Sequence, residues 1–148
     1  MTVYKRPVSV LVVIHLADLR VLLLERRAHP GYWQSVTGSQ ENDESLLDTA
    51  RREVHEETGI VATPGAFIDW QIANTYEIFT EWRHRYAPGI TQNTEHVFSL
   101  EVPAELPITL APAEHSNYLW LPWRAAAEKC FSWSNRDAIV MLAEKIAG

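Results

Sequence analysis

The chain has 148 residues, of which 47% are hydrophobic and 22% are charged, and its formal net charge is −6 at pH 7. This size and ordinary globular composition predict one folded domain over residues 1–148, without repeats or low-complexity segments. The negative charge argues against general affinity for nucleic-acid backbones, although a local basic cleft can still bind a polyphosphate.

The first apolar run covers residues 8–14 and is rich in β-branched side chains. It predicts a strand buried on both faces, and residues 21–24 predict a second strand beside it. The run is too short to span a membrane, and no small-residue cleavage site follows it. Cys130 is the only cysteine, which rules out an intramolecular disulfide and fits a reducing compartment. We therefore expect an untargeted, cytoplasmic protein.

Arg26 stands at the end of the second predicted strand, just before a loop signal at residues 29–31. Its forked guanidinium group suits phosphate oxygens. The same position also suits a surface ion pair with a carboxylate of the helix that follows. Arg26 is therefore either a phosphate ligand or one half of an ion pair.

Residues 44–58 predict an amphipathic helix, because they contain neither Gly nor Pro and carry apolar side chains at helical spacing. Gly59 supplies the expected stop. Glu53, Glu56 and Glu57 share one face of this helix and repel one another unless a cation lies between them. Their hard oxygen ligands suit Mg²⁺ or Mn²⁺ bridged to substrate phosphates. The alternative is a solvated acidic face balanced by neighbouring arginines.

The remaining chain predicts more strands and then two helices. Strands are expected at residues 60–63, 66–72, 76–86, 95–102 and 118–121, with a turn at 87–89. Helices are expected at residues 122–131 and from Ser134 onward, where Ser134 precedes an acid by three residues as in a capping box. This order favours an α/β (or α+β) fold, an α/β/α sandwich around a central mixed sheet.

Residues 38–60 also carry a longer pattern, Gly-x5-Glu-x7-Arg-Glu-aliphatic-x-Glu-Glu-x-Gly-aliphatic. It is filled by Gly38, Glu44, Arg52, Glu53, Val54, Glu56, Glu57, Gly59 and Ile60. The pattern resembles the signature box of the Nudix hydrolases at every defining position. The resemblance implies the Nudix fold and metal-dependent hydrolysis of a phosphoric anhydride. Ser39 and Asp43 stand where Gly is frequent in the family, in a loop that leaves the carboxylates untouched.

Four other segments, residues 4–14, 33–39, 83–89 and 132–136, resemble one branch of this family, the dihydroneopterin triphosphate diphosphatases of folate biosynthesis. The resemblance implies release of pyrophosphate from 7,8-dihydroneopterin 3′-triphosphate. A nearer alternative is a pyrophosphohydrolase of (d)NTPs or oxidised dGTP that sanitises the nucleotide pool. A more distant one is a Nudix module that binds a ligand without hydrolysis, although such proteins typically lose box glutamates and none is missing here.

The resemblance also implies roles for individual residues. The metal, Mg²⁺ or Mn²⁺ in its place, is expected on Glu53, Glu56, Glu57 and Glu114, with Glu114 as the candidate metal ligand or general base outside the box. Arg52 and Glu44 are expected to orient these groups by charge pairing.

The substrate is expected to be a small-molecule triphosphate rather than nucleic acid or a membrane. Lys5 and Arg26 are candidates for its phosphates, and Thr37 for a hydroxyl or backbone contact. Phe79 is a candidate stacking face for the pterin ring, and Ser132 a hydrogen-bonding partner nearby.

Overall fold

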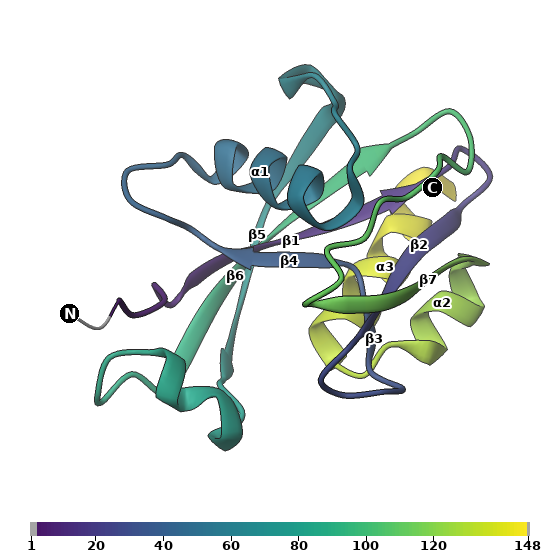
Figure 1. The fold of residues 1–148 in the computed structure, drawn as a ribbon. Coiled ribbons are helices and arrows are strands. Elements are labelled where there is room, and N and C mark those ends of the chain that lie inside the picture. Colours follow the sequence, from purple (N-terminus) through teal and green to yellow (C-terminus); the bar gives the residue numbers. More distant parts are fainter. Residues whose placement is uncertain (1–2, 148) are drawn as a thin grey trace.

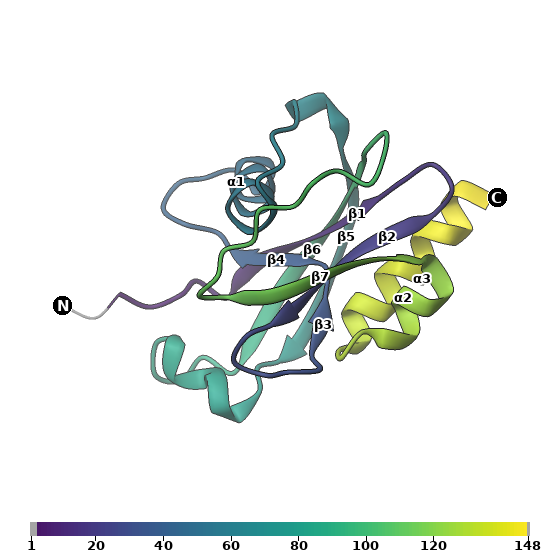
Figure 2. The same ribbon diagram turned by 45° about the vertical axis from the view of Figure 1, so that its right-hand side comes forward.

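A mixed sheet between helices forms the body of the molecule. The computed structural model describes residues 3–147. Helix α1 (Leu46–Thr58) covers one face of the sheet, and α2 (Trp123–Lys129) and α3 (Trp133–Ala147) cover the other (Figures 1 and 2). The predicted α/β/α sandwich is confirmed. None of the helices in residues 3–147 combines the length and apolar character needed to span a bilayer.

Strand β1 (Val8–His15) lies at the centre of the seven-stranded sheet. It pairs in parallel with β6 (Gln92–Glu101) and antiparallel with β2 (Arg20–Arg26) and β4 (Val36–Ser39). The outer strands are β5 (Phe67–Glu77) beside β6, and β3 (Trp33–Gln34) and β7 (His115–Pro122) beside β2. The parallel pair among antiparallel ones makes the sheet mixed.

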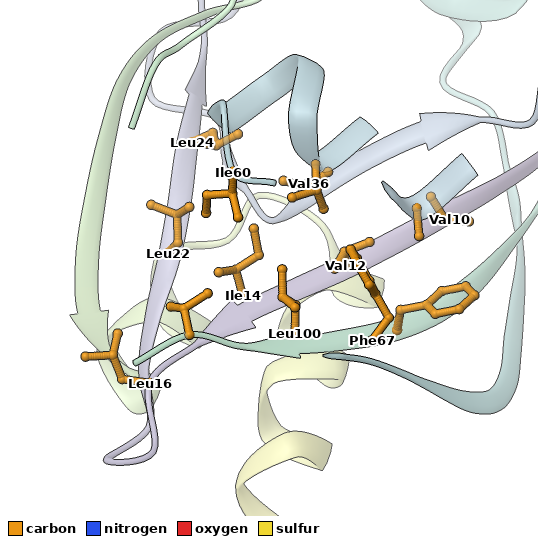
Figure 3. Close-up of a cluster of buried hydrophobic side chains, with 14 residues drawn as sticks. Val10, Val12, Ile14, Leu16, Leu22, Leu24, Val36, Ile60, Phe67 and Leu100 are labelled. Atoms are coloured by element: carbon orange, nitrogen blue, oxygen red, sulfur yellow. The ribbon is translucent and has the colours of Figure 1, made fainter. Parts of the chain in front are cut away.

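The core has two layers, because alternate side chains of β1 point to opposite faces of the sheet. Val10, Val12 and Ile14 pack in the layer under α1, which Figure 3 shows. Leu11 and Val13 pack in the layer that contains side chains of α2 and α3. Burial on both faces explains the almost unbroken apolar run from which this strand was predicted.

Two predicted strands are wrong. Residues 60–63 form no strand and lead into a short 3-10 helix, η1 (Pro64–Ala66). The strand predicted at residues 76–86 ends at Glu77, which pairs with Gln92 at the start of β6. The Ile78 N–H still donates to the Thr91 carbonyl at 2.8 Å, after which the chain no longer pairs with β6. The chain instead forms a second 3-10 helix, η2 (Thr80–Arg85).

The helix ends follow their caps. Ser45 accepts a hydrogen bond from the backbone N–H of Asp48 at 3.0 Å, so α1 begins at Leu46. Gly59 ends it in the left-handed conformation at φ 78°, as predicted. The predicted capping residue of the last helix is wrong by two positions, because the Ser132 hydroxyl, not Ser134, accepts from the backbone N–H of Asn135 at 3.4 Å.

Candidate active site

A cavity of about 940 Å³ opens where the N-terminal segment, α1, β6 and the loop before β7 meet. Its lining brings together seven of the predicted site residues, which are Lys5, Arg26, Thr37, Glu53, Glu56, Glu57 and Glu114. The others, Glu44, Arg52, Phe79 and Ser132, lie outside its lining.

The box glycine explains how Glu53 reaches the sheet. A Cβ added to Gly38 on β4 would lie less than 3.0 Å from three atoms of the Glu53 side chain. Only a residue without a side chain therefore lets α1 lay this carboxyl group against β4. On the same helix, Glu57 is only 2% exposed, whereas the side chain of Glu56 is 54% exposed.

Arg52, which lies outside the cavity lining, donates hydrogen bonds to three glutamates of the box. Its Nε–H and one terminal N–H donate to the two oxygens of Glu44, at 2.7 and 3.0 Å. The other terminal nitrogen donates to Glu53 at 2.7 Å and to Glu56 at 3.3 Å. The Arg52 guanidinium lowers the pKa of Glu44 to about 2. This geometry supports the predicted orienting role of both residues.

Glu57 and Glu53 form an acidic pair in which Glu57 is fully buried and only Glu53, through Arg52, has a cationic partner within hydrogen-bonding distance. Burial, and then the nearby Glu53 carboxyl group, raises the pKa of Glu57 well above its usual value, and burial also raises the pKa of Glu53. Oε1 of Glu57 has no hydrogen-bond partner, and the His115 ring lies 3.8 Å from it. Burial, and then the charge of Arg26, lowers the pKa of His115 to about 4, so this ring is neutral near pH 7.

A divalent cation fits this pair. Carboxylate oxygens are the ligands that Mg²⁺ and Mn²⁺ prefer, and the orphaned oxygen of Glu57 needs a partner. Within residues 3–147, no three His, Cys, Asp or Glu side chains are close enough together to form a complete set of metal ligands. Because like charges repel without a cation, we expect the carboxylates to draw together when an ion binds.

Cations line the same cavity. Lys5, Arg26 and Arg85 all contribute to its lining, and the Lys5 backbone N–H donates to the Arg85 carbonyl at 2.9 Å. Arg26 donates to Gln34 at 3.1 Å, and its guanidinium carbon lies 4.5 Å from the centroid of the Trp82 ring. Arg26 therefore contacts an amide and a ring and takes part in no ion pair among the described residues. Three cations beside an acidic pair suit an anionic ligand held through a metal.

The remaining predicted substrate residues lie as follows. The Thr37 hydroxyl accepts a hydrogen bond from Gln34 at 3.2 Å, within the cavity lining. Phe79 is 44% exposed and packs on Trp82, which does line the cavity, with ring centroids 4.9 Å apart. The Ser132 hydroxyl is engaged by Asn135 as a helix cap.

Several lining residues were not predicted from the sequence. They are Tyr76, Trp82, Arg85, Asn93, Glu95 and His115. The first three fall in the stretch wrongly interpreted as one strand. The next two occupy buried positions on one face of β6, and polar groups at buried strand positions are a signal that a sequence can offer.

The comparison with known proteins identifies the family. The NUDIX domain model matches residues 5–142. The chain belongs to the Nudix family. This Nudix hydrolase is 53% identical to the dihydroneopterin triphosphate diphosphatase of Escherichia coli (strain K12) over 140 residues, which cover 93% of this chain and 92% of that protein. It is 42% identical to the enzyme of the same name from Haemophilus influenzae, over 92% of this chain and 87% of that protein.

Solved structures agree with the sequence relatives. The E. coli dihydroneopterin triphosphate pyrophosphohydrolase superposes on this Nudix hydrolase with a TM-score of 0.89 at 49% identity, covering 97% of this chain and 99% of that one. A NUDIX hydrolase from Listeria monocytogenes has a TM-score of 0.80 at 23% identity, over 96% and 95% of the two chains, and shows the fold alone. The predicted family and its resemblance to the diphosphatase branch are confirmed. Nudix hydrolases use divalent metal ions.

Proposed function

We propose that this Nudix hydrolase converts 7,8-dihydroneopterin 3′-triphosphate to the monophosphate and pyrophosphate, as a step of folate biosynthesis, with residues 1–148 acting as one domain. The observation that carries this proposal is the 53% identity to an E. coli dihydroneopterin triphosphate diphosphatase over almost the whole of both chains. The cavity gives independent support, since it combines buried carboxylates with cations.

The metal in this proposal is Mg²⁺, with Mn²⁺ as the alternative ion. Glu53 and Glu57 would be its main ligands, Glu56 would add to the oxygen donor set, and Glu114 would serve either as a further ligand or as the general base. When bound, the ion would offset phosphate charge and polarise the attacked phosphorus. Arg52 and Glu44 hold the ligating carboxylates in place.

The chain's other residues bind and orient the substrate. Lys5, Arg26 and Arg85 donate charge-assisted hydrogen bonds to the phosphate oxygens. A water molecule attacks phosphorus, the bond to the bridging oxygen breaks, and pyrophosphate leaves. The proton of the attacking water passes to a carboxylate, for which exposed Glu114 at the cavity mouth is our candidate.

Substrate kinetics test this function. Pyrophosphate release with Mg²⁺ is compared for dihydroneopterin triphosphate, dATP and oxidised dGTP, in the wild type, Glu57→Gln and Asp48→Asn. Asp48 is the matched control because it is an exposed acid on the same helix outside the cavity. We expect the pterin to have the highest kcat/KM, a loss of at least about 100-fold in Glu57→Gln, and no change in Asp48→Asn. A preference for a nucleotide would overturn the substrate, and an active Glu57→Gln would overturn the site.

A further inference from the structure

Glu95 on β6 is a buried carboxylate that nothing in the mechanism uses. It is 2% exposed, yet it belongs to the lining of the cavity. Its Oε1 has no hydrogen-bond partner, and its Oε2 is 3.4 Å from the Tyr76 hydroxyl that donates to it. Among residues 3–147 it takes part in no ion pair. A buried carboxyl group with so few partners is costly, so a purely structural role is better filled by an apolar side chain.

A second acceptor without a donor lies beside it. Oδ1 of Asn93 is also buried and has no hydrogen-bond partner. The amide nitrogen of Asn93 donates to the Ser9 hydroxyl at 2.8 Å and to the Tyr76 hydroxyl at 3.0 Å, which fixes the orientation of the amide. The Tyr76 hydroxyl and the Asn93 amide nitrogen are already engaged, and the buried Ser134 hydroxyl also acts on the Glu95 carboxyl group, yet Oε1 of Glu95 and Oδ1 of Asn93 have no hydrogen-bond partner. The cavity is therefore built for a ligand that brings N–H donors.

The two acceptors share one face of β6. Asn93 and Glu95 are two residues apart, and the next residue on that face, Val97, packs in the layer with α2 and α3. Glu53 and Glu57 come from α1 on the opposite face, yet they line the same cavity. The acceptor pair therefore lies at a different end of the cavity from the acidic pair.

The strand register gives the separation of these two ends. Glu95 pairs with Ser9 across β6 and β1, and Ser9 pairs with Ser39 across β1 and β4. Ser39 follows Gly38, against which Glu53 lies. Two strand spacings place the two ends about 10 Å apart along the sheet, and the offset between its two faces adds to this separation. An elongated ligand with a ring at one end and phosphates at the other can reach from the acceptors to the acidic pair.

We propose that Glu95 and Asn93 are specificity-determining residues that accept hydrogen bonds from the ring N–H and 2-amino groups of the pterin. This proposal rests on the proposed function and deepens it. The lactam N–H and the amino group of a pterin lie side by side on one edge and are both donors, which suits a carboxylate. Guanine offers the same pair of donors, whereas adenine pairs its amino group with a ring acceptor. The site therefore selects pterin and guanine rings over adenine.

The first test is Glu95→Gln, which keeps the shape of the side chain but replaces one acceptor oxygen by a donor. Glu101→Gln is the matched control, because Glu101 is an exposed glutamate on the same strand outside the cavity. In Glu95→Gln we expect kcat/KM to fall about 10- to 100-fold for dihydroneopterin triphosphate and for dGTP. The value for dATP should change less than about threefold, and Glu101→Gln should match the wild type for all three. Equal losses for dATP and the pterin would contradict a role in reading the ring.

The second test uses the wild type alone and needs neither metal nor turnover. Binding of neopterin monophosphate is measured by fluorescence titration in EDTA, beside its lumazine counterpart in which an oxo group replaces the 2-amino group. We expect the pterin to bind about tenfold tighter or more, because the lumazine lacks the amino donor. Equal affinities, with normal turnover of the pterin triphosphate, would overturn this inference and leave the proposed function standing. Absence of any pterin binding or turnover would overturn both.

Discussion

The replacement Gly38→Ala separates the activity of this protein from its stability. The added Cβ would lie less than 3.0 Å from three atoms of the Glu53 side chain, so the carboxyl group must move by about 1 Å. The end of a glutamate side chain moves at little cost, and Gly38 does not have a positive φ. We therefore expect the free energy of unfolding to change by less than about 1 kcal/mol.

Activity should respond very differently. A misplacement of about 1 Å at a reacting centre costs about 100-fold in rate, so kcat/KM for pyrophosphate release should fall by about that factor and the Mg²⁺ requirement should rise. Gly65→Ala is the matched control, because a Cβ there meets nothing within 4 Å. The two variants are compared by chemical denaturation and by kinetics across a Mg²⁺ series. Wild-type kcat/KM and Mg²⁺ dependence in Gly38→Ala would refute the claim that Glu53 must lie against β4.

Four further predictions follow from the same contacts. Arg52→Lys loses the two-pronged contact with Glu44, so chemical denaturation should show a loss of about 1–3 kcal/mol and kinetics a lower kcat; unchanged values would contradict the bracing role. Mg²⁺ at 100 times its Kd should raise wild-type stability by about 2.7 kcal/mol and raise Tm, but should leave Glu57→Gln almost unaffected in thermal unfolding, while an equal shift in both would place the ion elsewhere. Burial raises the pKa of Glu95 to about 7, so the folded protein holds this proton more tightly than the unfolded chain. The associated stability is fully present below pH 4.5 and is lost as pH rises through 7, by roughly 3 kcal/mol, and Glu95→Gln should abolish that fall in pH-dependent denaturation. Glu114→Gln should lower kcat at least about tenfold, and unchanged turnover would remove it as base or ligand.

Local patterns predicted the elements whose own sequence shows which of their faces are buried. The unbroken apolar run of β1 and the helical spacing of α1 both reflect burial that a single segment already reveals. The box carboxylates could be predicted to share one face of α1, because residues at i, i+3 and i+4 are neighbours on the surface of any α-helix.

The errors arose where a distant partner decides the structure. Alternation at residues 76–86 is compatible with a strand, but the ladder with β6 ends where Glu77 pairs with Gln92, and after one further bond from Ile78 to Thr91 the chain forms a 3-10 helix. The cap of the last helix was predicted at Ser134, but the Ser132 hydroxyl accepts from the Asn135 N–H, and either serine suits a cap from the sequence alone. The open acceptors of Asn93 and Glu95 depend on sheet register and on Tyr76, which no local pattern specifies.

The most direct test of the central claim is ³¹P NMR of the products formed from dihydroneopterin triphosphate by the wild-type protein with Mg²⁺. We expect pyrophosphate and pterin monophosphate in equal amounts, with no reaction in EDTA. Orthophosphate with the pterin diphosphate, or an unconsumed substrate, would contradict it.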